Sequence, residues 1–154
     1  MAWGIKRTPI DKTVSDLVRY RDNWTCQRCF RQYAPPTASL QCSHYKSRKN
    51  LATRHDPDNC DALCAGCHTY FGSEAAEYRA WKVKRMGERA VTVLEYRARH
   101  PFKITKAEME LLHKELKQQM EKAKADYINR AGRPKDHHAA QQKSFLDNVN
   151  DEPF

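Results

Sequence analysis

Two pairs of cysteines constrain the fold of this chain more than any other feature of its sequence. Cys26 and Cys29 form one Cys-x2-Cys pair, Cys64 and Cys67 form the other, and the 34 residues from 30 to 63 separate them. Each short loop directs two sulfurs at one point, so together the pairs can supply the four thiolates of a tetrahedral structural zinc site. The separation is longer than in a simple zinc ribbon, which indicates that a further segment is inserted between the two halves of the site.

The compartment decides whether the six cysteines bind metal or form three disulfides. Lys6, Arg7, Asp11 and Lys12 interrupt the start of the chain, so no apolar secretory segment follows Met1. No apolar run approaches the ~20 residues that a membrane helix needs. We therefore expect a cytoplasmic protein that does not enter a membrane, and reduced thiols in that compartment favour structural zinc over disulfides.

The charge of the chain points to an anionic partner. Its 154 residues include 28 Lys and Arg against 19 Asp and Glu, which gives a formal net charge of +9. This excess favours a polyanion, most simply a nucleic acid. Hydrophobic residues make up only 40% of the chain, so we expect a small core that zinc partly replaces.

Apolar periodicity and turn residues divide the chain into four parts. Residues 1–12 are polar and are expected to form an N-terminal arm. Residues 13–72 hold all six cysteines and are expected to form the compact metal-bearing core. Helical periodicity over residues 73–130 predicts a helical extension. Residues 131–154 have almost no core-forming side chains and are expected to be disordered.

Local signals predict the elements within these parts. A short amphipathic helix over residues 13–22 leads into the first cysteine pair, and a strand-like stretch covers residues 39–45. A second helix starts at Ser73. Gly87 ends or breaks it, and a further helix follows over residues 88–99.

The last predicted helix is long. The capping box Thr105-Lys-Ala-Glu108 opens it, and it runs to about Arg130. An apolar stripe follows one side of it and consists of Leu112, Leu116, Met120, Ala123 and Tyr127. The stripe suits packing against the helices of residues 73–99 or against a partner helix, so a homodimer through the C-terminal helices is one expectation.

Three polar residues stand in register with the cysteine pairs. His44 lies at the end of the strand-like stretch, Asn59 stands five residues before Cys64, and His68 directly follows Cys67. Phosphodiester hydrolysis needs an activated water, a cation that stabilises charge in the transition state, and a proton for the leaving 3′-oxygen. A neutral imidazole, with a pKa of about 6.5, is a suitable general base at cytoplasmic pH.

This order resembles that of the HNH nucleases, which have the ββα-metal fold, over roughly residues 13–72. The resemblance implies an α+β protein in which a small zinc-stapled ββα-metal core carries an N-terminal helix and a helical C-terminal extension. The chain is most similar to phage recombination nucleases of the NinG/Rap type, through Ser43-His-Tyr, Thr53-Arg-His-Asp-Pro-Asp-Asn59 and Ala62-Leu-Cys-Ala-Gly-Cys67.

The resemblance also implies a role for each residue of the motif. His44 would be the general base and Asn59 would orient the loop that holds it. His68 would bind a single catalytic divalent cation, which can be Mg²⁺, Mn²⁺ or Zn²⁺. Cys26, Cys29, Cys64 and Cys67 would hold structural Zn²⁺.

The chain departs from the family at the residue before the base. HNH enzymes commonly carry Asp or His there as a second ligand of the catalytic cation, and this chain has Ser43. Three explanations are open. Ser43 binds the cation weakly or through water, Asp56 or Asp58 from the adjacent loop replaces it as a ligand, or Cys42 selects a thiophilic ion. In the absence of a ligand role, Cys42 and Cys60 are expected to be small buried residues near the metal-bearing core.

Four basic side chains follow His44 without an intervening acid, namely Lys46, Arg48, Lys49 and Arg54. Beside a phosphate-cleaving centre they can neutralise DNA backbone charge and position the strand. We therefore expect a metal-dependent HNH endonuclease that hydrolyses DNA phosphodiester bonds, selects branched or junction DNA, and acts in phage recombination in the bacterial host cytoplasm. The alternatives are a non-catalytic zinc module that binds nucleic acid, or an HNH nuclease that acts with a phage terminase in DNA packaging.

Overall fold

A computed structural model of the chain describes residues 5–131. The elements in chain order are α1 (Pro9–Arg21), β1 (Leu40–His44), α2 (Leu51–Arg54), the short 3-10 helix η1 (Pro57–Asn59), β2 (Cys60–Cys64), α3 (Ala65–Ser73), α4 (Ala75–Met86), α5 (Glu88–Arg99) and α6 (Lys106–Ala131). Among these helices, none is both long enough and apolar enough to cross a membrane.

The two strands form an antiparallel sheet that leads directly into a helix. Leu40 of β1 pairs with Cys64 of β2, and His44 pairs with Cys60 at the other end of the ladder. The connection from β1 to β2 carries α2 and η1, and α3 begins at the residue after β2. A small sheet among many helices makes this a helix-dominated α+β fold, the class that the sequence predicts.

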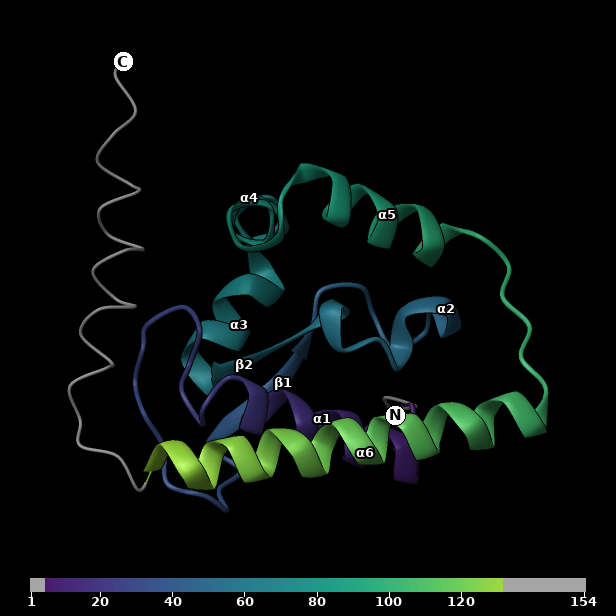
Figure 1. Ribbon diagram of the computed structural model, residues 1–154. Coiled ribbons are helices and arrows are strands. Elements are labelled where there is room, and N and C mark those ends of the chain that lie inside the picture. The colour runs from purple at the N-terminus through teal and green to yellow at the C-terminus, as the bar shows by residue number, and fades with distance from the viewer. Residues whose placement is uncertain (1–4, 132–154) are drawn as a thin grey trace.

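The sheet lies between two layers of helices (Figure 1). Helices α1 and α6 run side by side on one side of it, and α4 and α5 lie on the other side. Buried residues from α1, both strands and α6 form one core, which includes Val18, Leu40, Leu63 and Leu116. The core is therefore assembled from segments at both ends of the described chain.

Helix α1 begins at Pro9, four residues before the predicted start at Thr13. The Thr8 hydroxyl accepts a hydrogen bond from the backbone N–H of Asp11, and the Asp11 carboxylate accepts one from the Thr8 backbone over 2.8 Å. This reciprocal capping box, with proline at the first helical position, stabilises the start of the helix. Residues 9–12, which the sequence assigns to the N-terminal arm, form the first turn of α1.

The apolar stripe of α6 packs mainly against α1. Leu116 is 2% exposed in the core, and the ring of Tyr127 lies 5.6 Å from that of Tyr20. The Thr13 hydroxyl contacts Nε2 of His113 at 3.0 Å. The stripe therefore packs on α1, and its expected packing against the 73–99 helices is wrong. A homodimer through the C-terminal helices stays a prediction.

The other helical predictions agree with the structure except at Ser73, which ends α3, so that the predicted helix begins at Ala75 as α4. Gly87 has φ of +87°, a left-handed conformation that favours glycine, and α5 occupies Glu88–Arg99 as predicted. The capping box at Thr105 and Glu108 is formed, and α6 follows it. The predicted tail over residues 131–154 lies outside the described residues, apart from Ala131 at the end of α6.

Candidate functional site

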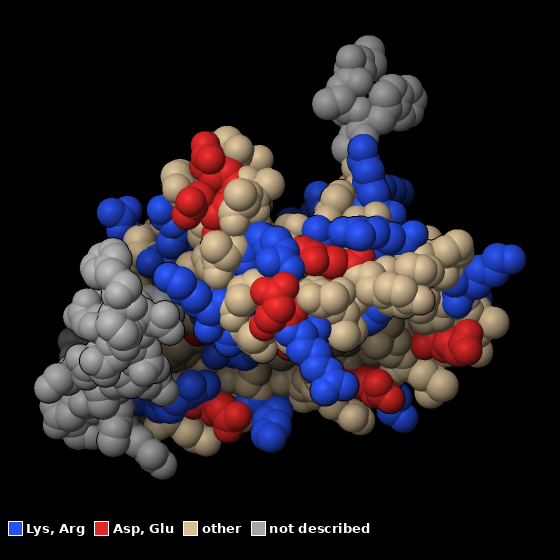
Figure 2. All heavy atoms as spheres, turned by 90° about the horizontal axis from the view of Figure 1, so that it is seen from above, with Lys and Arg blue, Asp and Glu red and all other residues tan. Residues whose placement is uncertain are grey.

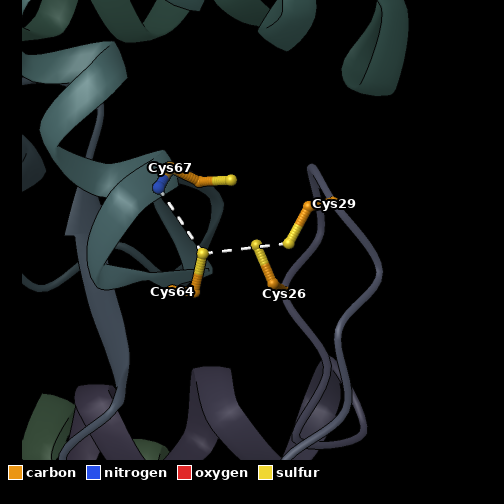
Figure 3. Close-up of side chains that lie close together, drawn as sticks. All are labelled: Cys26, Cys29, Cys64 and Cys67. Carbon is orange, nitrogen blue, oxygen red and sulfur yellow. Dashed lines mark hydrogen bonds between the residues drawn. The ribbon is translucent and has the colours of Figure 1, made fainter.

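The four cysteines of the two Cys-x2-Cys pairs converge on one point (Figure 3). Cys26 and Cys29 come from the loop after α1, and Cys64 and Cys67 come from the junction of β2 and α3. All four sulfurs lie within 4.8 Å of one another, and Sγ of Cys29 lies 3.8 Å from Sγ of Cys64. A tetrahedral zinc with Zn–S bonds of about 2.3 Å needs sulfurs about 3.8 Å apart. The predicted cysteines thus form a cluster that can hold a structural metal such as zinc.

Backbone turns hold both halves of this cluster. In the first half, the N–H of Phe30 donates to the carbonyl of Cys26 over 2.8 Å, and Phe30 takes a left-handed φ of 60° that closes the turn. In the second half, Cys64 caps the N-terminus of α3, and its Sγ accepts a hydrogen bond from the N–H of Cys67 over 3.5 Å. The strand and the helix therefore fix the positions of the sulfurs.

The thiols of the cluster differ in how readily they ionise. Burial raises the pKa of Cys29, and burial together with the neighbouring thiols raises the pKa of Cys67 to about 12. Burial raises the pKa of Cys64, but hydrogen bonds from the Cys67 backbone and the neighbouring thiols outweigh it and lower this pKa to about 7. The Arg28 guanidinium lies 3.6 Å from Sγ of Cys67 and 4.0 Å from the centre of the Tyr70 ring. This cation offsets part of the negative charge that four thiolates place on a divalent metal site.

His44 ends β1 with its imidazole held by the main chain. Its Nε2 lies 3.1 Å from the carbonyl oxygen of Arg54. A carbonyl only accepts hydrogen bonds, so Nε2 carries the proton and Nδ1 carries the free lone pair. Burial lowers the pKa of His44 to about 4, so the ring is neutral near pH 7. The ring therefore has a free lone pair that can accept a proton, and its lowered pKa makes it a weaker base than an ordinary histidine.

Asn59 connects the loop after β1 to the start of β2. It is fully buried, and its Oδ1 accepts a hydrogen bond from the N–H of Lys46 over 2.8 Å. Its Nδ2 donates to the carbonyls of Lys46, over 2.9 Å, and Thr53, over 3.0 Å. Thr53 precedes Arg54, whose carbonyl binds His44. Asn59 therefore fixes the loop around His44 without touching its ring, which is the arrangement that an orienting residue needs.

His68 and Ser43 lie with His44 around one cavity of about 520 Å³. Nδ1 of His68 contacts Oε1 of Gln41 at 2.6 Å, and burial lowers the pKa of this histidine. Gln41 Oε1 only accepts, so Nδ1 carries the proton and Nε2 of His68 is the nitrogen that can bind a metal. Ser43 is 1% exposed, and its hydroxyl lies 3.1 Å from the hydroxyl of Tyr78.

The structure does not assemble a complete second ligand set around His68. The described residues contain two groups of at least three potential His, Cys, Asp or Glu ligands, and His68 belongs to neither. Asp56 and Asp58, the predicted substitutes for Ser43, line a different cavity beside α5, where Asp56 pairs with Arg97. They are therefore not part of the cavity that holds His68.

Three of the four predicted phosphate-binding residues are accessible to different degrees, and the fourth is buried. Lys49 is exposed, and Lys46 and Arg48 are half-buried. Arg54 is only 9% exposed, and its guanidinium donates to both carboxylate oxygens of Asp11, over 2.9 and 2.6 Å. The expectation that Arg54 contacts DNA is wrong, because its charge is already paired inside the fold.

The cavity also has lining residues that the sequence does not reveal. Glu95 of α5 accepts hydrogen bonds from the hydroxyl of Tyr45 over 2.6 Å and from Nε of Arg79 over 3.0 Å. The side chain of Arg79 remains 40% exposed, so it places a cation at the edge of the cavity. These residues are 34 to 50 positions apart from Tyr45 in the chain, and no short motif connects them.

Behind Ser43, a buried polar network ties α4 to the sheet. The Tyr78 hydroxyl donates to Oδ2 of Asp61 over 3.3 Å, and Nζ of Lys82 reaches the same oxygen at 2.7 Å. Asp61 and Lys82 are each 1% exposed, and burial raises the pKa of Tyr78. The ion pair fixes α4, and with it Tyr78, against the strand residues that line the cavity.

Comparison with known proteins gives a family for the chain. A family model described as Bacteriophage Lambda NinG protein matches residues 6–126. No curated protein and no solved structure matches the chain. The match includes all elements from α1 to α5, most of α6, the four-cysteine cluster and the cavity around His44. The chain therefore belongs to the bacteriophage lambda NinG protein family.

Proposed function

We propose that this protein is a metal-dependent endonuclease of the HNH type that hydrolyses DNA phosphodiester bonds during phage recombination. The observation that carries the proposal is the neutral His44 imidazole, held through Nε2 by a backbone carbonyl at the edge of a cavity that His68 also lines. The chain order of β1, β2 and α3 supports it, because His44, Asn59 and His68 occupy this frame in the order of the HNH motif.

The residues of the cavity divide the chemistry between them. Nδ1 of His44 accepts the proton of the attacking water, while the Arg54 carbonyl stabilises the imidazolium that forms. A divalent cation bound at Nε2 of His68 would stabilise the developing charge on the scissile phosphate and the leaving 3′-oxygen. Attack on phosphorus breaks the bond to that oxygen, which takes a proton from a solvent water, so the products are a 5′-phosphate and a 3′-hydroxyl.

The charge distribution supports DNA as the substrate. Figure 2 shows the face formed by α4 and α5, where Lys and Arg side chains are spread widely and acidic side chains form smaller groups among them. Lys46 and Arg79 line the cavity itself, where each forms an ion pair with Glu95. No described element has the pattern of a recognition helix, so we propose selection by DNA structure, with branched or junction DNA as the preferred substrate.

A cleavage assay with matched variants tests this proposal. The zinc-retaining protein is incubated with a four-way junction, a flap and a linear duplex in Mg²⁺, Mn²⁺ or Zn²⁺. His44→Ala should abolish cleavage, and His100→Ala, at an exposed histidine outside the cavity, should leave it unchanged. Absence of cleavage with every ion, or unchanged cleavage by His44→Ala, would contradict the proposal. Equal cleavage of junction and linear duplex would contradict structure selection.

A non-catalytic zinc module that binds nucleic acid is the second candidate. Glu95 is the acidic side chain that lines the cavity, and it already accepts hydrogen bonds from Tyr45 and Arg79. It is therefore not free to bind a catalytic cation, which favours this candidate. Ser43 is likewise bonded to Tyr78. This candidate predicts DNA binding that is unchanged in His44→Ala and the absence of cleavage in the wild type.

A further inference from the structure

One face of the two-stranded sheet brings two thiols and an imidazole together. Cys42 and His44 are two residues apart in β1 and therefore lie on the same face of the sheet. Cys60 of β2 lies opposite His44 in the antiparallel register. The two sulfurs and a ring nitrogen of His44 all lie within 4.8 Å of one another. Cys60 is fully buried, whereas Cys42 is half-buried and gives the group access to solvent.

We propose that Cys42, His44 and Cys60 form a second zinc site, separate from the four-cysteine cluster. Two thiolates and one imidazole are a ligand set that zinc uses where a fourth position stays open to water. Tetrahedral zinc requires these ligand atoms to lie about 3.5 to 3.8 Å apart, so the separations of at most 4.8 Å need to close by about 1.3 Å or less.

The hydrogen bond of His44 prepares its ring for this role. Nε2 donates to the carbonyl of Arg54, which fixes the ring and leaves the lone pair on Nδ1. Histidines that bind metals typically donate their other ring N–H to a carbonyl or carboxylate in this way. The buried Arg54–Asp11 pair holds the carbonyl, so the ring orientation is set before any ion arrives.

The register of the strands favours metal binding over a disulfide between the two thiols. Cys42 pairs with Ala62, and Cys60 pairs with His44, so the cysteines are diagonal neighbours. Diagonal neighbours in an antiparallel pair are separated by about 7–8 Å, whereas disulfides usually join Cα atoms about 4.4–6.8 Å apart. A zinc ion between the sulfurs spans this longer separation.

Occupation of the site has a consequence that rests on the proposed function. The Nδ1 lone pair that would bind zinc is the one that would accept the proton of the attacking water. Zinc at this site therefore inhibits cleavage, while Mg²⁺, which prefers oxygen ligands, leaves His44 free. The site would make the enzyme sensitive to free zinc.

Cobalt binding tests the site independently of nuclease activity. Protein that retains its structural zinc is titrated with Co²⁺ under reducing conditions, and the thiolate-to-cobalt charge-transfer absorbance is followed. Zn²⁺ binds such sites more tightly than Co²⁺, so the structural ion stays in place. The wild type and the control His100→Ala should each bind one equivalent of Co²⁺ with this absorbance. Cys42→Ala and His44→Ala should lose it while circular dichroism shows an unchanged fold.

The result that overturns the site is an absence of the charge-transfer absorbance in the wild type, or its survival in either Cys42→Ala or His44→Ala. Inhibition is measured separately, by adding Zn²⁺ to a cleavage reaction that contains Mg²⁺. Zn²⁺ should inhibit the wild type and should spare Cys42→Ala, whose substitution leaves the base in place. If the wild type binds cobalt as expected but does not cleave DNA, the proposed function fails and the metal site stands.

Discussion

The carbonyl oxygen of Arg54 accepts a hydrogen bond from Nε2 of His44 over 3.1 Å. The side chain of the same arginine forms a buried ion pair with Asp11, which also closes the capping box at the start of α1. One residue thus connects the first turn of the N-terminal helix to the orientation of the proposed base. The position of His44 thus depends on a contact between two residues that are 43 positions apart in the chain.

The Arg54–Asp11 pair should be important for stability. Arg54→Gln removes the cation and leaves the buried Asp11 carboxylate without its ion-pair partner, so that only the bonds from Thr8 and the contact with His55 remain. Breaking a buried pair in this way costs about 3–5 kcal/mol. We expect a loss of this size in the free energy of unfolding measured by urea denaturation. Lys49→Gln, at an exposed position, should change it by less than about 0.5 kcal/mol. Equal effects of the two substitutions would contradict the structural role of Arg54.

The same pair predicts a pH dependence of stability. Burial raises the pKa of Asp11, but hydrogen bonds from Arg54 and Thr8 outweigh it and hold this pKa far below its usual value. A carboxyl whose pKa is lower in the folded state stabilises the protein above its unfolded pKa of about 3.9, and this contribution is lost as the pH falls. The stability difference between the wild type and Asp11→Asn should therefore be largest at neutral pH and shrink below about pH 4. A difference that does not change with pH would exclude this explanation.

Removal of the structural metal should unfold the core. Elemental analysis of the purified protein in a reducing buffer should show tightly held zinc that Cys64→Ser loses, because the cluster needs all four thiolates. Circular dichroism should show loss of helix in Cys64→Ser and retention of helix in Cys42→Ser, a thiol outside the cluster. A folded Cys64→Ser protein without metal would contradict a structural role for zinc here.

The packing of α6 on α1 predicts a contrast between two leucines five residues apart. Leu116 is 2% exposed in the core, and Leu111 is 62% exposed. Leu116→Ala should lower the free energy of unfolding by about 2–5 kcal/mol, because it leaves a cavity between the helices. Leu111→Ala should change it by less than about 0.5 kcal/mol. If Leu111→Ala were the more destabilising variant, the orientation of α6 described here would be wrong.

Local sequence signals predicted helix boundaries that are set by residues at the boundary itself. Gly87 marks the break between α4 and α5, and the box at Thr105 and Glu108 marks the start of α6. The capping box at Thr8 and Asp11 carries the same kind of signal, with Asp in place of Glu, and it explains the earlier start of α1.

Long-range pairing is what the sequence did not reveal. The basic run after His44 is typical of a phosphate-binding loop, and nothing within it shows that Arg54 is paired with Asp11. In the same way, Tyr78 falls within the helix predicted from Ser73 to Gly87, and that prediction does not show that its hydroxyl bridges Ser43 and Asp61. Such polar contacts depend on how the helices pack against the sheet, which periodicity within one helix cannot specify.

The most direct test of the proposed nuclease is single-turnover cleavage of a labelled four-way junction in Mg²⁺ or Mn²⁺ by the wild type, His44→Ala and His100→Ala. Removing a general base typically lowers the rate about 10²- to 10⁴-fold. We predict a loss of this size in His44→Ala, with junction binding unchanged, and a wild-type rate in His100→Ala. Cleavage by His44→Ala at the wild-type rate would contradict the assignment of His44 as the base.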